Sequence, residues 1–171
     1  PLRPEAAAVL SQLREMGVQL WICSGDNERT VRHLAQQLGV ANFTACVSPS
    51  GKAEKVAALQ AVGEVVAMVG DGINDAPALA QADLGVAIGG GTDVAIETAD
   101  VVLLNSDLGG VAVALHLARA VMRRIRLNFV WAFGYNIVGL PLAAGVFYPA
   151  YQIHLPPMFA GAAMALSSVS V

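Results

Sequence analysis

The sequence predicts a parallel α/β domain followed by α-helical membrane segments, and three observations lead to this prediction. Short apolar runs alternate with helix-like stretches over residues 1–106, which is typical of a parallel sheet covered on both faces. All 13 acidic residues lie before residue 108, and no charged residue follows Arg126. Hydrophobic residues make up 56% of the 171 residues, whereas a soluble domain usually has about 45–50%.

Local signals predict the elements of residues 1–106. A helix over 4–16 stops at Gly17, and a helix over 28–38 stops at Gly39. The further predicted helices are 51–62, 76–81 and 93–98. The apolar runs that predict strands are 18–23, 43–47, 65–69, 84–88 and 101–104. Polar loops follow several of these strands, and parallel α/β sheets bind ligands in such loops.

The rest of the chain has a different character. Residues 107–126 predict an amphipathic connecting helix with an arginine collar, which consists of Arg119, Arg123, Arg124 and Arg126. The uncharged residues 127–148 are long enough to cross a bilayer core of about 30 Å. We predict an extracytoplasmic loop over residues 149–157. Over residues 158–171 we predict the truncated start of a last membrane helix. Arginines before an apolar span favour a multi-pass membrane protein with a cytoplasmic α/β domain, and argue against nucleic-acid binding.

Three polar segments of the α/β part are candidates for one phosphate-binding site. Ser24-Gly25-Asp26-Asn27 follows the first strand, Lys52 begins a helix, and Gly70-Asp71-Gly72-Ile73-Asn74-Asp75 follows the third strand. Two carboxylates four residues apart offer the oxygen ligands that Mg²⁺ takes together with phosphate oxygens. The glycines allow close backbone approach to a phosphate, and a hydroxyl and an ammonium group can hold phosphoryl oxygens.

These motifs resemble those of P-type ATPases, whose phosphorylation domain is similar to haloacid dehalogenases. The segment from Met68 to Leu79 resembles the hinge motif, Ser24-Gly25-Asp26 resembles Thr-Gly-Asp with the hydroxyl kept, and Lys52 falls where the family has its phosphate-binding lysine. The resemblance implies that residues 1–106 are a partial, haloacid dehalogenase-like (Rossmannoid) phosphorylation domain. It also implies the use of ATP and Mg²⁺ and an aspartyl-phosphate intermediate.

The resemblance also assigns site residues. It places Mg²⁺ on Asp71, supported by Asp75, and phosphate contacts at Gly70 and Gly72. The catalytic site that it implies consists of Ser24, Gly25, Asp26, Lys52, Asp71, Asn74 and Asp75.

The nucleophilic aspartate of the family is expected elsewhere, because the chain contains no Asp-Lys-Thr-Gly-Thr segment. We therefore expect a fragment of a larger ATPase that by itself neither hydrolyses ATP nor forms a phosphoenzyme. The expected partners are the lipid bilayer and the remaining domains and membrane segments of the ATPase, without any nucleic acid.

Polar groups in the apolar part suit a soft cation. Copper(I) accepts thioether sulfur and carries a single charge. Zinc or cadmium, once stripped of water, favours a charged ligand. Residues 127–171 contain no Asp, Glu, Lys or Arg. Tyr135-Asn136 and the segment from Met164 to Ser168 resemble signatures of copper(I) ATPases. The resemblance thus implies ATP-driven copper(I) export, with Tyr135, Asn136, Met164 and Ser168 as metal ligands. Silver(I) suits the same ligands. The copper assignment adds a copper chaperone to the expected partners.

Three alternatives stay open at this point. A zinc or cadmium P-type ATPase would be expected to carry a charged residue in these membrane helices. A haloacid dehalogenase-type phosphatase with a membrane anchor would need an aspartate on a strand before Ser24, and residues 2–20 contain no aspartate. A non-enzymatic regulatory or interaction fragment is compatible with every residue of the chain.

Overall fold

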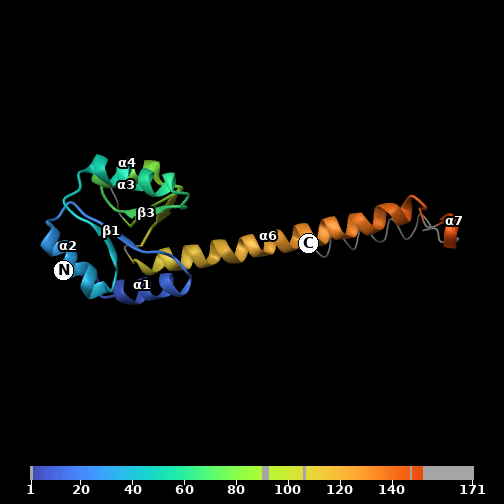
Figure 1. The fold of residues 1–171 in the computed structure, drawn as a ribbon, viewed down its shortest axis with the longest axis horizontal. Coiled ribbons are helices and arrows are strands. Elements are labelled where there is room, and N and C mark those ends of the chain that lie inside the picture. Colours follow the sequence, from blue (N-terminus) through green and yellow to red (C-terminus); the bar gives the residue numbers. More distant parts are fainter. Residues whose placement is uncertain (1, 90–92, 106, 147, 152–171) are drawn as a thin grey trace. The chain divides into compact units, whose positions relative to one another are not determined.

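The computed structural model describes residues 2–89, 93–105, 107–146 and 148–151 (Figure 1). The chain divides into two compact units, Pro1–Leu115 and His116–Val171. The elements up to the last strand are α1 (Ala6–Glu15), β1 (Trp21–Cys23), α2 (Glu28–Leu38), β2 (Asn42–Thr44), α3 (Pro49–Ala61), β3 (Ala67–Gly70), the 3₁₀ helix η1 (Ile73–Asp75), α4 (Ala76–Gln81), β4 (Leu84–Ile88), α5 (Asp93–Thr98) and β5 (Val101–Leu103). The later elements are α6 (Gly109–Ala143) and α7 (Tyr148–Tyr151).

Local capping residues set the boundaries of the helices next to the site. The side chain of Asn27 accepts a hydrogen bond from the Thr30 N–H at 2.9 Å and caps α2. This helix ends before Gly39, whose φ of 64° lies in the left-handed region that glycine favours. The hydroxyl of Ser48 accepts a hydrogen bond from the Gly51 N–H at 3.1 Å, and α3 therefore begins earlier than the predicted range of 51–62.

The strands form two parallel sheets instead of the single sheet that was predicted. β1 pairs with β2, and β3, β4 and β5 pair in that order. All of these pairs are parallel, which confirms the α/β class. No strand pairing joins β1 to β3 within the part of the chain that the structure describes. Alternation of strands and helices predicts parallel strands but does not fix which strands become neighbours, because pairing is a long-range contact.

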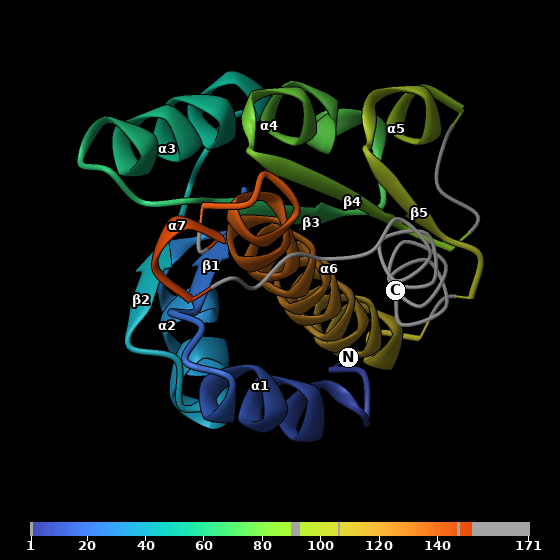
Figure 2. The ribbon, with the colours of Figure 1, turned by 90° about the vertical axis from the view of Figure 1, so that its right-hand side faces the viewer.

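One side of the three-stranded sheet is covered by helices. α3, α4 and α5 lie in a row there, and α4 contacts both β3 and β4 (Figure 2). The core between α4 and the sheet includes Ala78, Leu79, Val86, Ala87 and Ile88, all at most 5% exposed. The approach of α4 to β4 is close, because a Cβ at Gly85 would lie 2.7 Å from the carbonyl oxygen of Leu79.

Two carboxylates connect the strands of this sheet at their amino ends. Asp83, directly before β4, accepts a hydrogen bond from the Val66 N–H at 2.8 Å, just ahead of β3. Asp100, directly before β5, accepts one from the Gly85 N–H in β4, also at 2.8 Å. Each aspartate therefore fixes the start of its own strand against the preceding strand of the sheet.

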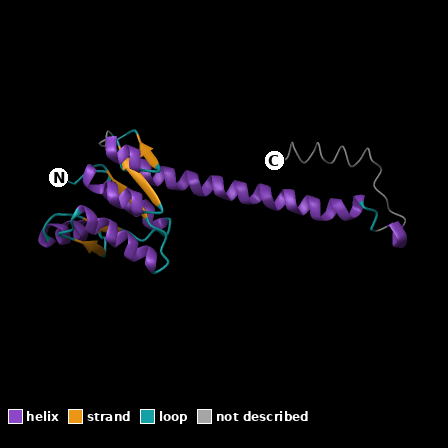
Figure 3. Ribbon diagram, turned by 90° about the horizontal axis from the view of Figure 1, so that it is seen from above, coloured by secondary structure: helices purple, strands orange, loops and turns teal. Residues whose placement is uncertain are grey.

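α6 is one continuous helix of 35 residues (Figure 3). Pro141 lies inside this helix, near its carboxyl end. Its first turns belong to the first unit, where Ala112 packs with Val9 and Leu13 of α1. Among the described residues, no helix combines the length and the apolar character needed to cross a membrane. The membrane span predicted at 127–148 is therefore not confirmed.

The end of the chain departs from the prediction in part. The residues Tyr148–Tyr151 form the short helix α7, although a loop was predicted over 149–157. The predicted last membrane helix, 158–171, lies outside the described residues.

Candidate active site

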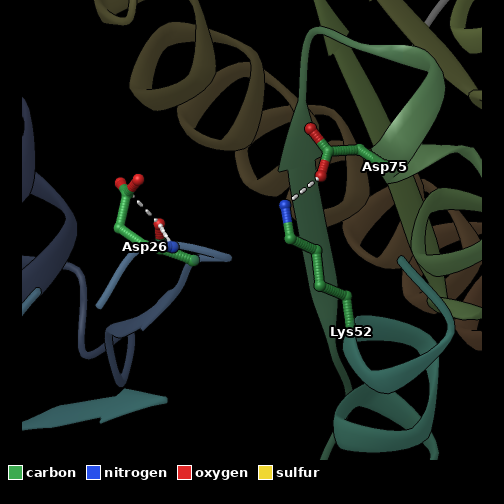
Figure 4. A network of polar contacts seen from close by, with 4 residues as sticks. Asp26, Lys52 and Asp75 are labelled. Carbon is green, nitrogen blue, oxygen red and sulfur yellow. Dashed lines mark hydrogen bonds and ion pairs between the residues drawn. The ribbon is translucent and has the colours of Figure 1, made fainter. Parts of the chain in front are cut away.

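An ion pair between Lys52 and Asp75 is the centre of the candidate site. The Nζ atom of Lys52 lies 2.6 Å from Oδ1 of Asp75 (Figure 4). The two side chains are only 16% and 13% exposed, so water screens their attraction less than it does for a surface pair. The capping residue Ser48 starts α3 and thereby places Lys52 in the first turn of that helix, where its N–H bonds to the Ser48 carbonyl at 3.0 Å.

The position of Asp75 depends on the glycine that ends β3. A Cβ at Gly70 would lie 2.6 Å from Cβ of Asp75 and 2.8 Å from its Oδ2, so Asp75 would have to shift to admit any side chain there. The Asp75 N–H donates to the carbonyl of Gly72 at 3.0 Å and closes the turn of η1. Gly72 itself has no such restriction, since its nearest neighbour would be 3.9 Å away. Gly70 therefore makes the space in which the Lys52–Asp75 pair forms.

Ser24 and Asp26 form a second polar pair after β1. The hydroxyl of Ser24 donates to Oδ2 of Asp26 at 3.0 Å and accepts a hydrogen bond from the Asp26 N–H at 3.2 Å. Figure 4 shows Asp26 apart from Lys52 and Asp75, and no hydrogen bond between these described residues joins the two pairs. The predicted site residues thus form two separate contacts instead of one connected network.

Cys23 is a neighbour of the site that was not predicted. Burial raises the pKa of its thiol, Lys52 and Lys55 act to lower that pKa, and Asp75 acts to raise it further. These charges act on Cys23 only because they lie near the carboxyl end of β1. The Nζ atom of Lys55 also lies 4.0 Å from the ring centroid of Trp21, which connects α3 to β1. The one sequence signal for Cys23 is its place at the end of a strand.

The side chains of Asp71 and Asn74 are not engaged by other described residues. Both are exposed, and neither side chain makes a hydrogen bond to another described residue. Within the described ranges, no group of three His, Cys, Asp or Glu side chains could enclose a metal ion. Mg²⁺ does not require such a group, because it commonly takes one or two carboxylates and completes its shell with water and phosphate oxygens. The loop therefore fits an open Mg²⁺ site on Asp71, while Asp75 is engaged by Lys52.

Half of the predicted copper ligands lie in described residues. Tyr135 is 40% exposed on α6. The side-chain amide of Asn136 donates to the Ala132 carbonyl at 2.9 Å, one turn earlier in the same helix. Met164 and Ser168 lie outside the described residues. The copper ligands, like the phosphate and Mg²⁺ ligands, stay a prediction.

Known proteins resemble the chain over its whole length. Residues 1–83 match the family of haloacid dehalogenase-like hydrolases. A copper-transporting ATPase of Oryza sativa subsp. japonica is 55% identical over 171 residues, which are 100% of this chain and 18% of that protein. Copper-transporting ATPase 2 of Mus musculus is 55% identical over 170 residues, or 99% of this chain and 12% of that protein.

A solved structure shows a similar fold. A zinc-transporting PIB-type ATPase in the E2.Pi state superposes with a TM-score of 0.77 and 43% sequence identity, over 82% of this chain and 23% of that one. The chain therefore spans less than a quarter of the length of each of these proteins.

Proposed function

We propose that this chain, whose α/β part is a haloacid dehalogenase-like domain, is the phosphorylation domain and adjoining helices of a P-type ATPase that exports copper(I). The observation that carries the proposal is the 55% identity to a copper-transporting ATPase over 171 residues. That match includes α6 and the residues after it, whereas the match to haloacid dehalogenase-like hydrolases covers residues 1–83. The similarity to haloacid dehalogenase-like hydrolases therefore does not account for the part of the chain after residue 83.

The proposed chemistry is phosphoryl transfer from ATP to an aspartate that lies in another segment of the ATPase. In the proposal, the Lys52 ammonium and the Ser24 hydroxyl hold phosphoryl oxygens, and Asp75 keeps the lysine in place through their 2.6 Å contact. Gly25, Asp26, Gly70 and Gly72 shape the backbone around the phosphate. Asp71 holds Mg²⁺ with support from Asn74 and Asp75. When bound, the metal neutralises negative charge on the phosphates.

The proposed transport path uses the second part of the chain. Copper(I) passes Tyr135, Asn136, Met164 and Ser168 in a multi-pass membrane protein whose α/β domain faces the cytoplasm. Support comes from the alignment with copper-transporting ATPases and from the absence of charge after Arg126. The arginine collar at the start of the apolar stretch agrees with this orientation. The bilayer, the other ATPase segments and a copper chaperone are the proposed partners.

Zinc transport is the second candidate because a zinc-transporting ATPase is 43% identical to the chain. Copper is favoured for two reasons. The copper-transporting relatives are more similar, at 55% identity, and residues 127–171 contain no charged ligand for a divalent cation.

A chimera tests the proposal. This chain replaces the equivalent segment of the Oryza copper-transporting ATPase, and ATP hydrolysis by the purified chimera is measured with copper(I), silver(I) and zinc(II). We expect stimulation by copper(I) and silver(I). Asp71→Asn or Lys52→Met should lower the rate by a factor of about 100–1,000, the usual cost of losing one group that stabilises transition-state charge. Glu64→Gln, which makes the same carboxylate-to-amide change at an exposed position away from the site, is the matched control.

Three outcomes would contradict parts of the proposal. Stimulation by zinc(II) alone would end the copper assignment. Full stimulation of Met164→Leu, which keeps the volume but removes the sulfur, would remove Met164 from the metal path. The isolated chain should not hydrolyse ATP, and hydrolysis that Asp71→Asn abolishes would show that the chain holds a complete site.

A further inference from the structure

A short backbone segment joins the two polar pairs of the candidate site. Residues 44–48, here called the coupling segment, run from the last residue of β2 to the residue that caps α3. Three backbone hydrogen bonds connect this segment to the loop that carries Ser24. They run from the Ser24 N–H to the Thr44 carbonyl at 3.0 Å, from the Val47 N–H to the Ser24 carbonyl at 3.2 Å, and from the Cys46 N–H to the Asp26 carbonyl at 2.8 Å.

The other end of the coupling segment fixes the helix that carries Lys52. The hydroxyl of Ser48 accepts a hydrogen bond from the Gly51 N–H at 3.1 Å, and its carbonyl accepts one from the Lys52 N–H at 3.0 Å. Val47 lies against this first turn of α3, since a Cβ at Gly51 would be 2.8 Å from Cγ1 of Val47. The backbone path from the Ser24 loop to Lys52 is therefore short and is held by hydrogen bonds at both ends.

Cys46 gives the coupling segment its unusual course. Its φ of 55° lies in the left-handed region, and it is the one non-glycine residue with a positive φ among the described residues. A residue keeps this unfavourable conformation only where the surrounding structure imposes it. The thiol is exposed, so side-chain packing does not explain the conformation. Successive residues of an extended strand face opposite sides, whereas here two successive N–H groups, those of Cys46 and Val47, donate to the same loop.

We propose that Cys46 is a positioning residue, whose left-handed backbone sets the place of the Ser24 hydroxyl relative to the Lys52 ammonium. The hydroxyl follows the backbone because it donates to Oδ2 of Asp26, and the carbonyl of Asp26 receives the Cys46 N–H. The coupling segment thus relates the two polar pairs that Figure 4 shows apart. The inference rests on the proposed function, in which Ser24 and Lys52 hold oxygens of one phosphoryl group.

Three substitutions of Cys46 separate the backbone from the thiol. Valine is strongly disfavoured at positive φ, glycine adopts it readily, and serine keeps the size and conformational limits of cysteine but removes the sulfur. The rate of ATP hydrolysis is measured in the chimera with the Oryza copper-transporting ATPase. Cys46→Val should lower the rate about 100-fold, the usual effect of misplacing a group by about 1 Å. Cys46→Gly and Cys46→Ser should both keep most of the parent rate.

A double-mutant cycle shows whether Cys46 acts through Ser24. Ser24→Ala removes the hydroxyl, so its position no longer matters in that background. Adding Cys46→Val to Ser24→Ala should therefore lower the rate by less than about threefold further. Independent effects, including a general loss of folded protein, would instead multiply, and the double variant would then be about 100-fold slower than Ser24→Ala.

Gly25→Ala perturbs the same contact from the opposite side. Its Cβ would lie 3.3 Å from the Val47 carbonyl oxygen, so it presses on the coupling segment without demanding a large shift. This variant should lower the rate severalfold, and the loss should likewise disappear in the Ser24→Ala background. Circular dichroism identifies the folded variants, and if Cys46→Val does not fold, the cycle with Gly25→Ala decides.

The possible failures are distinguishable. Parent rates in the folded Cys46→Val and Gly25→Ala variants, or losses that multiply with that of Ser24→Ala, would refute the positioning role and leave the proposed function intact. Equal losses in Cys46→Ser and Cys46→Val would also refute it, because the thiol and not the backbone would then be required. A parent chimera that copper(I), silver(I) and zinc(II) all fail to stimulate would refute the proposed function and the positioning role together.

Discussion

Replacing Gly70 with alanine should destabilise the α/β domain through the Lys52–Asp75 pair. The new Cβ would lie 2.6 Å from Cβ of Asp75, and an ordinary contact begins at 3.4 Å, so Asp75 must move by 3.4 − 2.6, or about 0.8 Å. If Lys52 does not follow and the shift is directed away from it, their 2.6 Å contact lengthens to at most about 3.4 Å, beyond hydrogen-bonding distance.

The expected cost follows from these two effects. Overpacking alone costs about 1–3 kcal/mol, and a hydrogen bond to a charged group contributes about 1.5–3 kcal/mol. Because Lys52 can follow part of the movement, we expect a loss of about 2 kcal/mol in the free energy of unfolding. That loss corresponds to a decrease in Tm of about 8 °C for a domain of this size.

Gly72→Ala is the matched control in the same loop. Its Cβ would have no neighbour closer than 3.9 Å, and the backbone φ of −126° suits alanine. Its effect should therefore stay within about 0.5 kcal/mol. Thermal unfolding of both variants, followed by circular dichroism, gives the comparison. Equal melting temperatures for Gly70→Ala and Gly72→Ala would refute the role assigned to Gly70.

Three further predictions concern other parts of the first unit. Gly85→Ala should cost about 3 kcal/mol, more than Gly70→Ala, because its Cβ meets a backbone carbonyl that cannot rotate away; a smaller loss in thermal unfolding would argue against this. Burial raises the pKa of Cys23 above its usual 9.0, whereas Cys46 is exposed. In single-cysteine variants, iodoacetamide should therefore modify Cys46 several-fold faster at pH 8, and equal rates by mass spectrometry would contradict this. The hydrogen bond from the Val66 N–H holds the pKa of Asp83 below its usual 3.8. The ionised carboxylate therefore stabilises the fold fully above pH 3.8, and this stabilisation is lost as the pH falls through the lowered pKa of the folded state. Urea unfolding should show Asp83→Asn less stable than the parent at pH 6, with a difference that shrinks toward pH 2; a constant difference would be evidence against the assignment.

Helix positions were predictable wherever a local signal exists. The bounds predicted for α2, 28–38, agree with the structure because both of its ends depend on adjacent residues, Asn27 as a cap and Gly39 as a stop. The start of α3 was predicted too late, although Ser48 followed by proline is itself a helix-start signal. Strand ends were less accurate, since three-residue strands such as β1 and β5 end where pairing ends.

Contacts between distant residues were not predictable in detail. The sequence places Lys52 and two aspartates on loops of the same α/β domain, but nothing local decides that Asp75 and not Asp71 receives the ammonium group. That choice depends on the turn of η1 and on the space at Gly70. The division into two sheets likewise depends on strand pairing, which no single segment encodes.

The hydrogen bonds of Asp83 and Asp100 to neighbouring strands determine where the domain tolerates inserted residues. An extra residue between Asp83 and Leu84 would shift β4 by one position and turn its buried side chains to the opposite face. Extra residues at Gly63 would leave the Asp83–Val66 bond unchanged, because they lie upstream of it in a turn whose flanking side chains are largely exposed. A fluorescent or affinity tag for following this domain within a longer protein therefore belongs at Gly63.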